Sequence, residues 1–110
     1  MYKEQYVKIG TAQLLKEKGF DWDTDKVYER SIMACIYEDY PMPTQQMACR
    51  WLREEKGIHP ELELCTDNEF SFTIYKLDGK RTVLYEESHC WTNSEDAVEA
   101  AILYVLNNLI

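Results

Sequence analysis

Thr44–Ile58, with the sequence TQQMACRWLREEKGI, decides much of the fold because it contains a complete helix with both of its end signals. A threonine that can cap a helix comes first, apolar residues follow at helical spacing, and a glycine suited to a helix end comes near the last position. A shorter near-copy, TAQLLKEKGF, occupies Thr11–Phe20. We therefore predict two short amphipathic helices, each of which leads into an extended segment.

The apolar spacing divides the longer of these helices into two faces. The inner face should carry residues spaced by three or four positions: Met47, Ala48, Trp51, Leu52 and Glu55. The opposite face should carry Gln46, Cys49, Arg50 and Arg53. In the shorter helix, the Thr11 hydroxyl should cap the start and Gly19 should end it.

A β-hairpin is predicted after these helices. Phe70–Leu77 and Lys80–Glu86 flank Asp78-Gly79, a dipeptide typical of a two-residue hairpin turn. Such a turn predicts the pairs Leu77 with Lys80, Ile74 with Val83, and Phe72 with Tyr85. The last two pairs should form one apolar face, which helices should cover.

Two further segments are predicted to be short strands. Gln5–Ile9 is a candidate because Val7 and Ile9 lie on one face. Glu61–Thr66 alternates, so that Leu62 and Leu64 should face inward.

Residues 21–40 are compatible with a helix, since four large residues recur at every fourth position: Tyr28, Ile32, Ile36 and Tyr40. The β-branched and aromatic residues around Ile32–Tyr37 favour one or two strands instead. The stop at Pro41-Met42-Pro43 also suits a strand, and we favour this interpretation.

The C-terminal helix has a different pattern from the other two. We predict it over about Glu95–Leu109, with Ser94 as its cap. One side is a broad apolar stripe: Ala97, Val98, Ala101, Ile102, Val105, Leu106 and Leu109. Leu103 and Ile110 lie on roughly the opposite side, and Tyr104 lies on the flank. A helix that is apolar nearly all round is either central in the fold or shared with a partner.

Together these elements predict a single α+β domain over residues 1–110, with a small antiparallel sheet and three helices packed mainly on one face. A chain of 110 residues can bury one modest core. No apolar run approaches the roughly 18 residues that span a membrane, so no membrane partner is expected.

The cysteines and the charge bear on the surroundings of the protein. The start of the chain has no signal-peptide pattern, so we expect a cytoplasmic protein with four reduced thiols, Cys35, Cys49, Cys65 and Cys90. The 12 basic and 20 acidic residues give a net charge of −8, which argues against binding nucleic acid by charge attraction. An acidic surface could instead compete with nucleic acid for a basic protein, although solubility alone also explains it.

No residue pattern points to catalysis, a cofactor or a metal. Three alternating carboxylates resemble the start of a calcium loop: Asp21, Asp23 and Asp25. Lys26 and Ile32 occupy the positions where that loop needs glycine and glutamate. His89 and Cys90 are adjacent, but residues next to each other on a strand point to opposite faces, and no C-x-x-C pair is present.

The aromatic residues suggest an interaction surface instead. Eight tyrosines and three tryptophans exceed the usual needs of a small core, and partly exposed aromatic rings are typical interface anchors. Large rings used as core filler explain the same composition equally well. The candidate surface residues are Tyr37, Tyr40, Tyr75, Trp91, Leu103 and Tyr104.

Three segments together carry a resemblance: MYKEQYVKIGTAQLLKEKGFDW, YPMPTQQMACRWLREEKGI and SEDAVEAAILYVLNNLI. The chain resembles small proteins encoded by phages, prophages and mobile elements of gut Bacteroidetes, over about half of its length. That group has no established activity, so the resemblance assigns no catalytic residue. It implies a bacterial or phage-infected cytoplasm and an accessory role.

We therefore predict a non-enzymatic accessory or protein-interaction module of phage or mobile-element origin, which binds a protein partner. The alternative is a small homo-oligomeric structural protein that associates through its C-terminal helix. An enzyme is the third hypothesis, because nothing in the sequence converges on chemistry.

Overall fold

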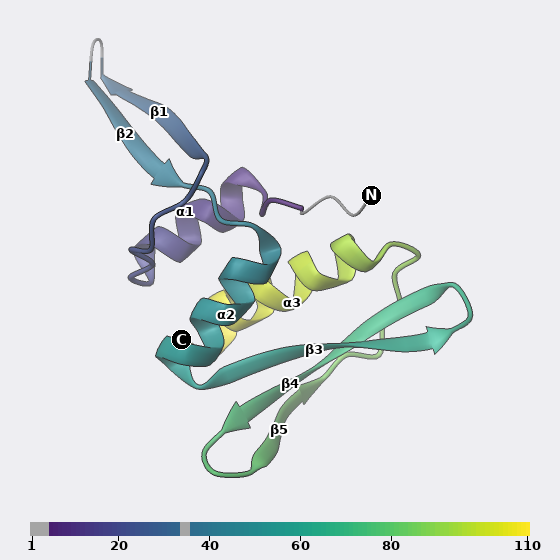
Figure 1. Cartoon of the computed structure of the whole chain (residues 1–110). Coiled ribbons are helices and arrows are strands. Elements are labelled where there is room, and N and C mark those ends of the chain that lie inside the picture. Colours follow the sequence, from purple (N-terminus) through teal and green to yellow (C-terminus); the bar gives the residue numbers. More distant parts are fainter. Residues whose placement is uncertain (1–4, 34–35) are drawn as a thin grey trace.

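The computed structural model describes residues 5–33 and 36–110, without the side chains of residues 30–38, and confirms the predicted α+β fold. Its three helices are α1 (Ile9–Glu17), α2 (Gln45–Lys56) and α3 (Ser94–Asn108). A two-stranded antiparallel sheet consists of β1 (Val27–Met33) and β2 (Ile36–Pro41). A three-stranded antiparallel sheet, in the order β3-β4-β5, consists of β3 (Ile58–Thr66), β4 (Glu69–Leu77) and β5 (Arg81–Glu86) (Figure 1). The prediction of one sheet is thus corrected to two.

Helix α3 is the central element of the molecule. It contacts β3 and β4 as well as α1 and α2 (Figure 1). Its buried apolar residues are Ala97, Ala101, Ile102, Val105 and Leu106. This central position explains why the sequence of α3 is apolar on nearly every side. None of the helices within residues 5–33 and 36–110 is long and apolar enough to cross a membrane.

Helix α2 has the end structures that the sequence predicts. The Thr44 hydroxyl accepts a hydrogen bond from the Met47 amide at 3.1 Å, and Gly57 ends the helix with a φ of 66°. Trp51 and Leu52 are buried in the core. Glu55 is exposed, so its assignment to the inner face was wrong. A charged carboxylate would be costly to bury without a partner, and this position lies in the last turn of the helix.

The start of α1 differs from the prediction. The helix begins at Ile9, two residues before Thr11, and the predicted strand before it is reduced to a single bridge between Tyr6 and Thr44. Thr11 is buried, and its hydroxyl donates to the carboxylate of Glu99. The predicted cap was therefore wrong, because this hydroxyl serves a buried carboxylate and not the helix start.

The cap of α3 also differs by one residue. The side-chain oxygen of Asn93 accepts hydrogen bonds from the amides of Glu95 at 2.8 Å and Asp96 at 3.3 Å. Ser94 is already the first helical residue. Asparagine and serine are both good caps, so two adjacent candidates could not be separated by residue type.

The turn of the β4–β5 hairpin has three residues and not two. Leu77 pairs with Arg81, which leaves residues 78–80 in the turn, and Gly79 has a φ of 93°. Three-residue loops with glycine in this conformation are a common hairpin connection. The predicted register was therefore wrong near the turn.

Farther along the hairpin, a register shift lies between Ile74 and Tyr75. Ile74 consequently faces Tyr85, while Val83 faces Tyr75 and is 49% exposed. Val83 therefore does not belong to the covered apolar face, to which the sequence had assigned it.

Cys65 and Cys90 form a disulfide, which corrects the prediction that all four cysteines are reduced. Cys65 lies near the end of β3. The segment after β5 runs along β4, where Phe70 and Trp91 exchange two backbone hydrogen bonds of 2.7 Å. This return path brings two cysteines together that are 25 residues apart. Cys49 is free, and Cys35 lies outside the described residues.

The strands favoured for residues 21–40 are confirmed as β1 and β2. They form a ribbon that projects from the rest of the molecule (Figure 1). At its base the rings of Tyr28 and Tyr40 stack with centroids 6.1 Å apart.

Candidate interaction groove

A groove of about 480 Å³ lies between α2, the start of α3 and β3. Its α2 wall consists of the face that the sequence placed away from the core: Gln46, Cys49, Arg50 and Arg53. The α3 wall consists of Ser94, Glu95 and Val98, and Leu62 contributes from β3. The volume is in the range of clefts that bind ligands or peptide side chains.

The floor of the groove is apolar and leads into a recess of about 60 Å³. The groove and the recess share Cys49, Leu62 and Val98, and Phe72 also lines the recess. Leu62 and Leu64 were predicted to face inward, yet they are 37% and 68% exposed. The helices cover the first part of β3 but leave these two leucines open.

β3 is an edge strand, and backbone groups in its second half point away from the sheet. Leu64 pairs with Phe70, but both backbone groups of Phe70 bond Trp91 on the other side of β4. The N–H and C=O of Leu64 must therefore point toward the free edge. Because backbone groups alternate in direction along a strand, the backbone groups of Leu62 and the C=O of Pro60 point toward the same edge. Pro60 has no N–H to donate, which suits this orientation. Within the described residues, Leu62 and Leu64 form no backbone hydrogen bond on that edge.

A buried carboxylate holds one end of the groove together. Glu99 on α3 is only 4% exposed. One of its oxygens accepts hydrogen bonds from the Lys8 amide at 3.0 Å and from the Thr11 hydroxyl, and the other accepts from the Gln45 side chain at 3.0 Å. Gln45 also donates to the Glu95 carbonyl at 2.9 Å. These bonds join the starts of all three helices, so the spacing of the groove walls is fixed.

The groove side carries charges of both signs, Arg50 and Arg53 on α2 and Glu95 on α3. The Arg50 side chain forms an ion pair with Glu54 at 2.5 Å. Arg53 is exposed, and no carboxylate within the described residues forms an ion pair with it.

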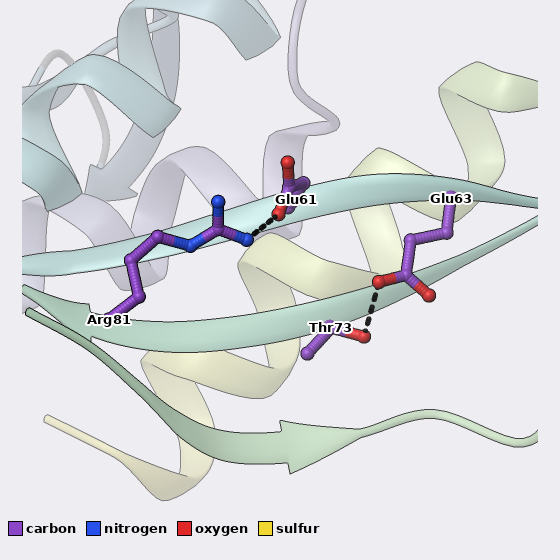
Figure 2. Close-up of polar contacts among 4 residues, drawn as sticks. All are labelled: Glu61, Glu63, Thr73 and Arg81. Carbon is purple, nitrogen blue, oxygen red and sulfur yellow. Dashed lines mark hydrogen bonds and ion pairs between the residues drawn. The ribbon is translucent and has the colours of Figure 1, made fainter.

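The opposite face of the sheet carries negative charge beside the same edge. Arg81 forms an ion pair with Glu61 at 2.7 Å, and the Thr73 hydroxyl donates to Glu63 at 2.8 Å (Figure 2). Arg81 also lies 4.2 Å from the centre of the Tyr75 ring. In the part of the chain that the structure describes, no cation pairs with Glu63. The outer side of the β3 edge therefore carries two carboxylates and Arg81, whereas the groove side carries two arginines and Glu95.

Two titratable groups near the groove, Cys49 and His59, have shifted pKa values. Burial raises the pKa of the Cys49 thiol to about 12, so it is not a reactive thiolate near neutral pH. Burial, with the nearby charge of Arg53, lowers the pKa of His59. The buried Nδ1 of His59 has no hydrogen-bond partner within the described residues. Among those residues, no three histidine, cysteine, aspartate or glutamate side chains are grouped as for a metal ion.

The predicted interaction residues do not form one surface. Tyr75 lies on β4, where its ring contacts the Arg81 guanidinium. The remaining rings with described side chains pack against other rings: Trp91 on Phe72, Tyr104 on Tyr85, and Tyr40 on Tyr28.

Burial decides how these predicted residues can act. Tyr40 is only 7% exposed, so its prediction as a surface anchor was wrong. Leu103 and Tyr104 are half-buried on α3. The side chain of Tyr37 lies outside the described residues.

The three alternating carboxylates of the predicted sequence pattern are exposed in the connection between α1 and β1: Asp21, Asp23 and Asp25. Sequence reasoning thus missed the groove, although it had identified the α2 face that forms one wall.

No family model, curated protein or solved structure matches this chain. The resemblance to phage and mobile-element proteins therefore stays a prediction.

Proposed function

We propose that this chain is a non-enzymatic protein-interaction module that binds a protein partner in the groove between α2, α3 and β3. The observation that carries this proposal is the open apolar floor, to which Leu62 contributes while it is 37% exposed. Leu64, which is 68% exposed, continues the apolar face of β3 beyond the groove. Exposed apolar side chains that line a concave, polar-rimmed surface are typical of interaction sites.

Two observations support a binding role over the alternatives. The pKa of Cys49 is too high for a nucleophile near neutral pH, which counts against an enzyme built on this groove. Most apolar residues of α3 are buried against the sheet and the other helices, which counts against self-association through α3. An accessory role of the kind that the resemblance implies is compatible with a small binding module.

Site-specific photo-crosslinking in the native cell tests this proposal. A photoreactive amino acid replaces Gln46 in the groove wall, and a matched control replaces Glu55. These positions are nine residues apart and therefore on opposite sides of α2. We expect a discrete protein adduct from position 46 and none from position 55. Equal adducts from both positions, or none from position 46, would contradict the proposal.

A further inference from the structure

We propose that the second half of β3, Leu62–Thr66, is a docking edge for an extended segment of a protein partner. The segment pairs antiparallel with β3, places apolar side chains on the groove side and places basic side chains on the outer side. This inference rests on the proposed function and adds the binding mode and the chemistry of the partner.

The backbone of β3 supplies the first reason. The N–H and C=O groups of Leu62 and Leu64 point away from β4 and are free on that edge within the described residues. An added strand can satisfy all four groups at once, as in other complexes formed by strand addition. An antiparallel strand places each partner residue that bonds Leu62 or Leu64 on the same face as these leucines.

The apolar groove supplies the second reason. A partner residue opposite Leu62 directs its side chain toward the groove and the recess below it. The recess of about 60 Å³ has roughly the volume of two water molecules in the liquid, so it suits a small aliphatic side chain. Its walls include Phe72 and Val98, which offer no hydrogen-bonding side chain.

The distribution of charge fixes which face of the partner is basic. Glu61 and Glu63 lie on the outer face beside the free edge (Figure 2). A lysine or arginine of an added strand would lie next to Glu63, which forms no direct ion pair among the described residues, although its charge acts on Arg81. Arg53 on the groove side would repel the same lysine there. Because the groove floor is apolar and the outer face carries Glu61 and Glu63, a strand with alternating basic and apolar residues should dock with its apolar face toward the groove.

A second copy of this chain fits the edge poorly. In a two-fold antiparallel pair of β3 strands centred on Leu62, Glu61 of each copy would lie opposite Glu63 of the other. Like charges placed directly opposite each other destabilise a strand pair. The net charge of −8 on each chain adds to this repulsion. In this register the charge pattern thus favours a basic partner over self-pairing.

Synthetic peptides test the docking mode on the intact protein. The probe is a capped hexapeptide of alternating lysine and valine, and binding is measured by calorimetry in about 150 mM salt, which screens long-range attraction. We expect N-methylation of the valines to weaken binding at least about tenfold, because it removes the N–H groups that face Leu62 and Leu64. N-methylation of the lysines should change binding less than about twofold, since those N–H groups point away from β3. The two modified peptides have the same charge.

A matched pair of protein variants tests the same contact from the other side. Leu62→Pro removes the outward N–H at a position where Pro60 shows that proline is compatible with β3. Leu62→Ala keeps that N–H and serves as the control. We expect Leu62→Pro to weaken peptide binding at least about tenfold more than Leu62→Ala, with thermal unfolding of both variants as the check on folding. If Leu62→Pro does not fold, the N-methylated peptides decide the matter alone.

The outcomes separate this inference from the proposed function. Equal binding of both N-methylated peptides, or equal binding by a peptide of alternating glutamate and valine, would overturn the inference. An adduct at position 46 in the same protein would then show that the groove binds a partner in another way. If no adduct forms at position 46, the proposed function itself is overturned.

Discussion

The two halves of β3 have the same alternating sequence and the same partner strand but different surroundings. Ile58 and Pro60 in the first half are buried, whereas Leu62 and Leu64 in the second half are exposed. Both halves pair with β4 in one register up to the irregularity near Cys65. Alternation therefore shows which face a side chain is on, while the reach of α2 and α3 decides whether that face is covered.

This difference assigns stability to the first half of β3 and binding to the second half. The first half contributes to the core, and its side chains lose contact with water when the chain folds. The second half adds little to the core, which leaves its leucines and its backbone edge available to a partner.

The largest expected difference is between Ile58→Ala and Leu64→Ala. Ile58 is 7% exposed, so its truncation should lower the free energy of unfolding by about 2–5 kcal/mol. Leu64 is mostly exposed, so the same change there should stay within about 0.5 kcal/mol. Urea unfolding of both variants measures the contrast. Similar losses at both positions would show that the second half is part of the core after all.

The second half should depend on its disulfide more than on packing. Replacing Cys65 and Cys90 by serine should lower the free energy of unfolding by about 3 kcal/mol, the range expected for a loop of this size. The natural protein should lose a similar amount in reducing agent, while the double variant should not respond to it. A natural protein that is equally stable with and without reducing agent would contradict this role of the disulfide.

A smaller effect is expected from His59 in the first half. Its pKa is lowered in the folded protein, chiefly by burial, so the unfolded chain binds the proton more readily. The contribution of this group to stability is complete above the unfolded pKa of about 6.5 and is lost as the pH falls through it.

Chemical unfolding at about pH 7.5 and about pH 5.5 measures this effect. His59→Asn should reduce the loss of stability at the lower pH, whereas His89→Asn, at an exposed position, should leave it unchanged. An identical pH dependence in the natural protein and in His59→Asn would rule out His59 as its source.

Local signals in the sequence were sufficient for α2. Thr44 and Gly57 each act on backbone groups within a few residues, so both ends of the helix could be predicted. Where two neighbouring residues offer the same chemistry, as Asn93 and Ser94 do, the sequence could not decide between them. The sequence also could not decide whether the β4–β5 turn contains two or three residues. The third residue, Lys80, shifts the pairing of β4 with β5 near the turn by one position.

The groove could not be predicted because it depends on contacts that are distant in sequence. The bond between Gln45 and the Glu95 carbonyl spans 50 residues, and those between Glu99 and the start of α1 span about 90. The sequence identified the α2 face with Cys49 and Arg53, but not the second wall opposite it. Pro60 was a usable signal, since proline inside an alternating strand indicates an edge.

Amide hydrogen exchange measured residue by residue tests the docking edge most directly. In the free protein, the amides of Leu62 and Leu64 should exchange rapidly, while those of Glu61 and Glu63 should be protected by β4. Addition of the lysine–valine peptide should slow exchange at Leu62 and Leu64 at least about tenfold and leave the two glutamates nearly unchanged. Slow exchange at Leu62 and Leu64 in the free protein, or no change on binding, would contradict the account.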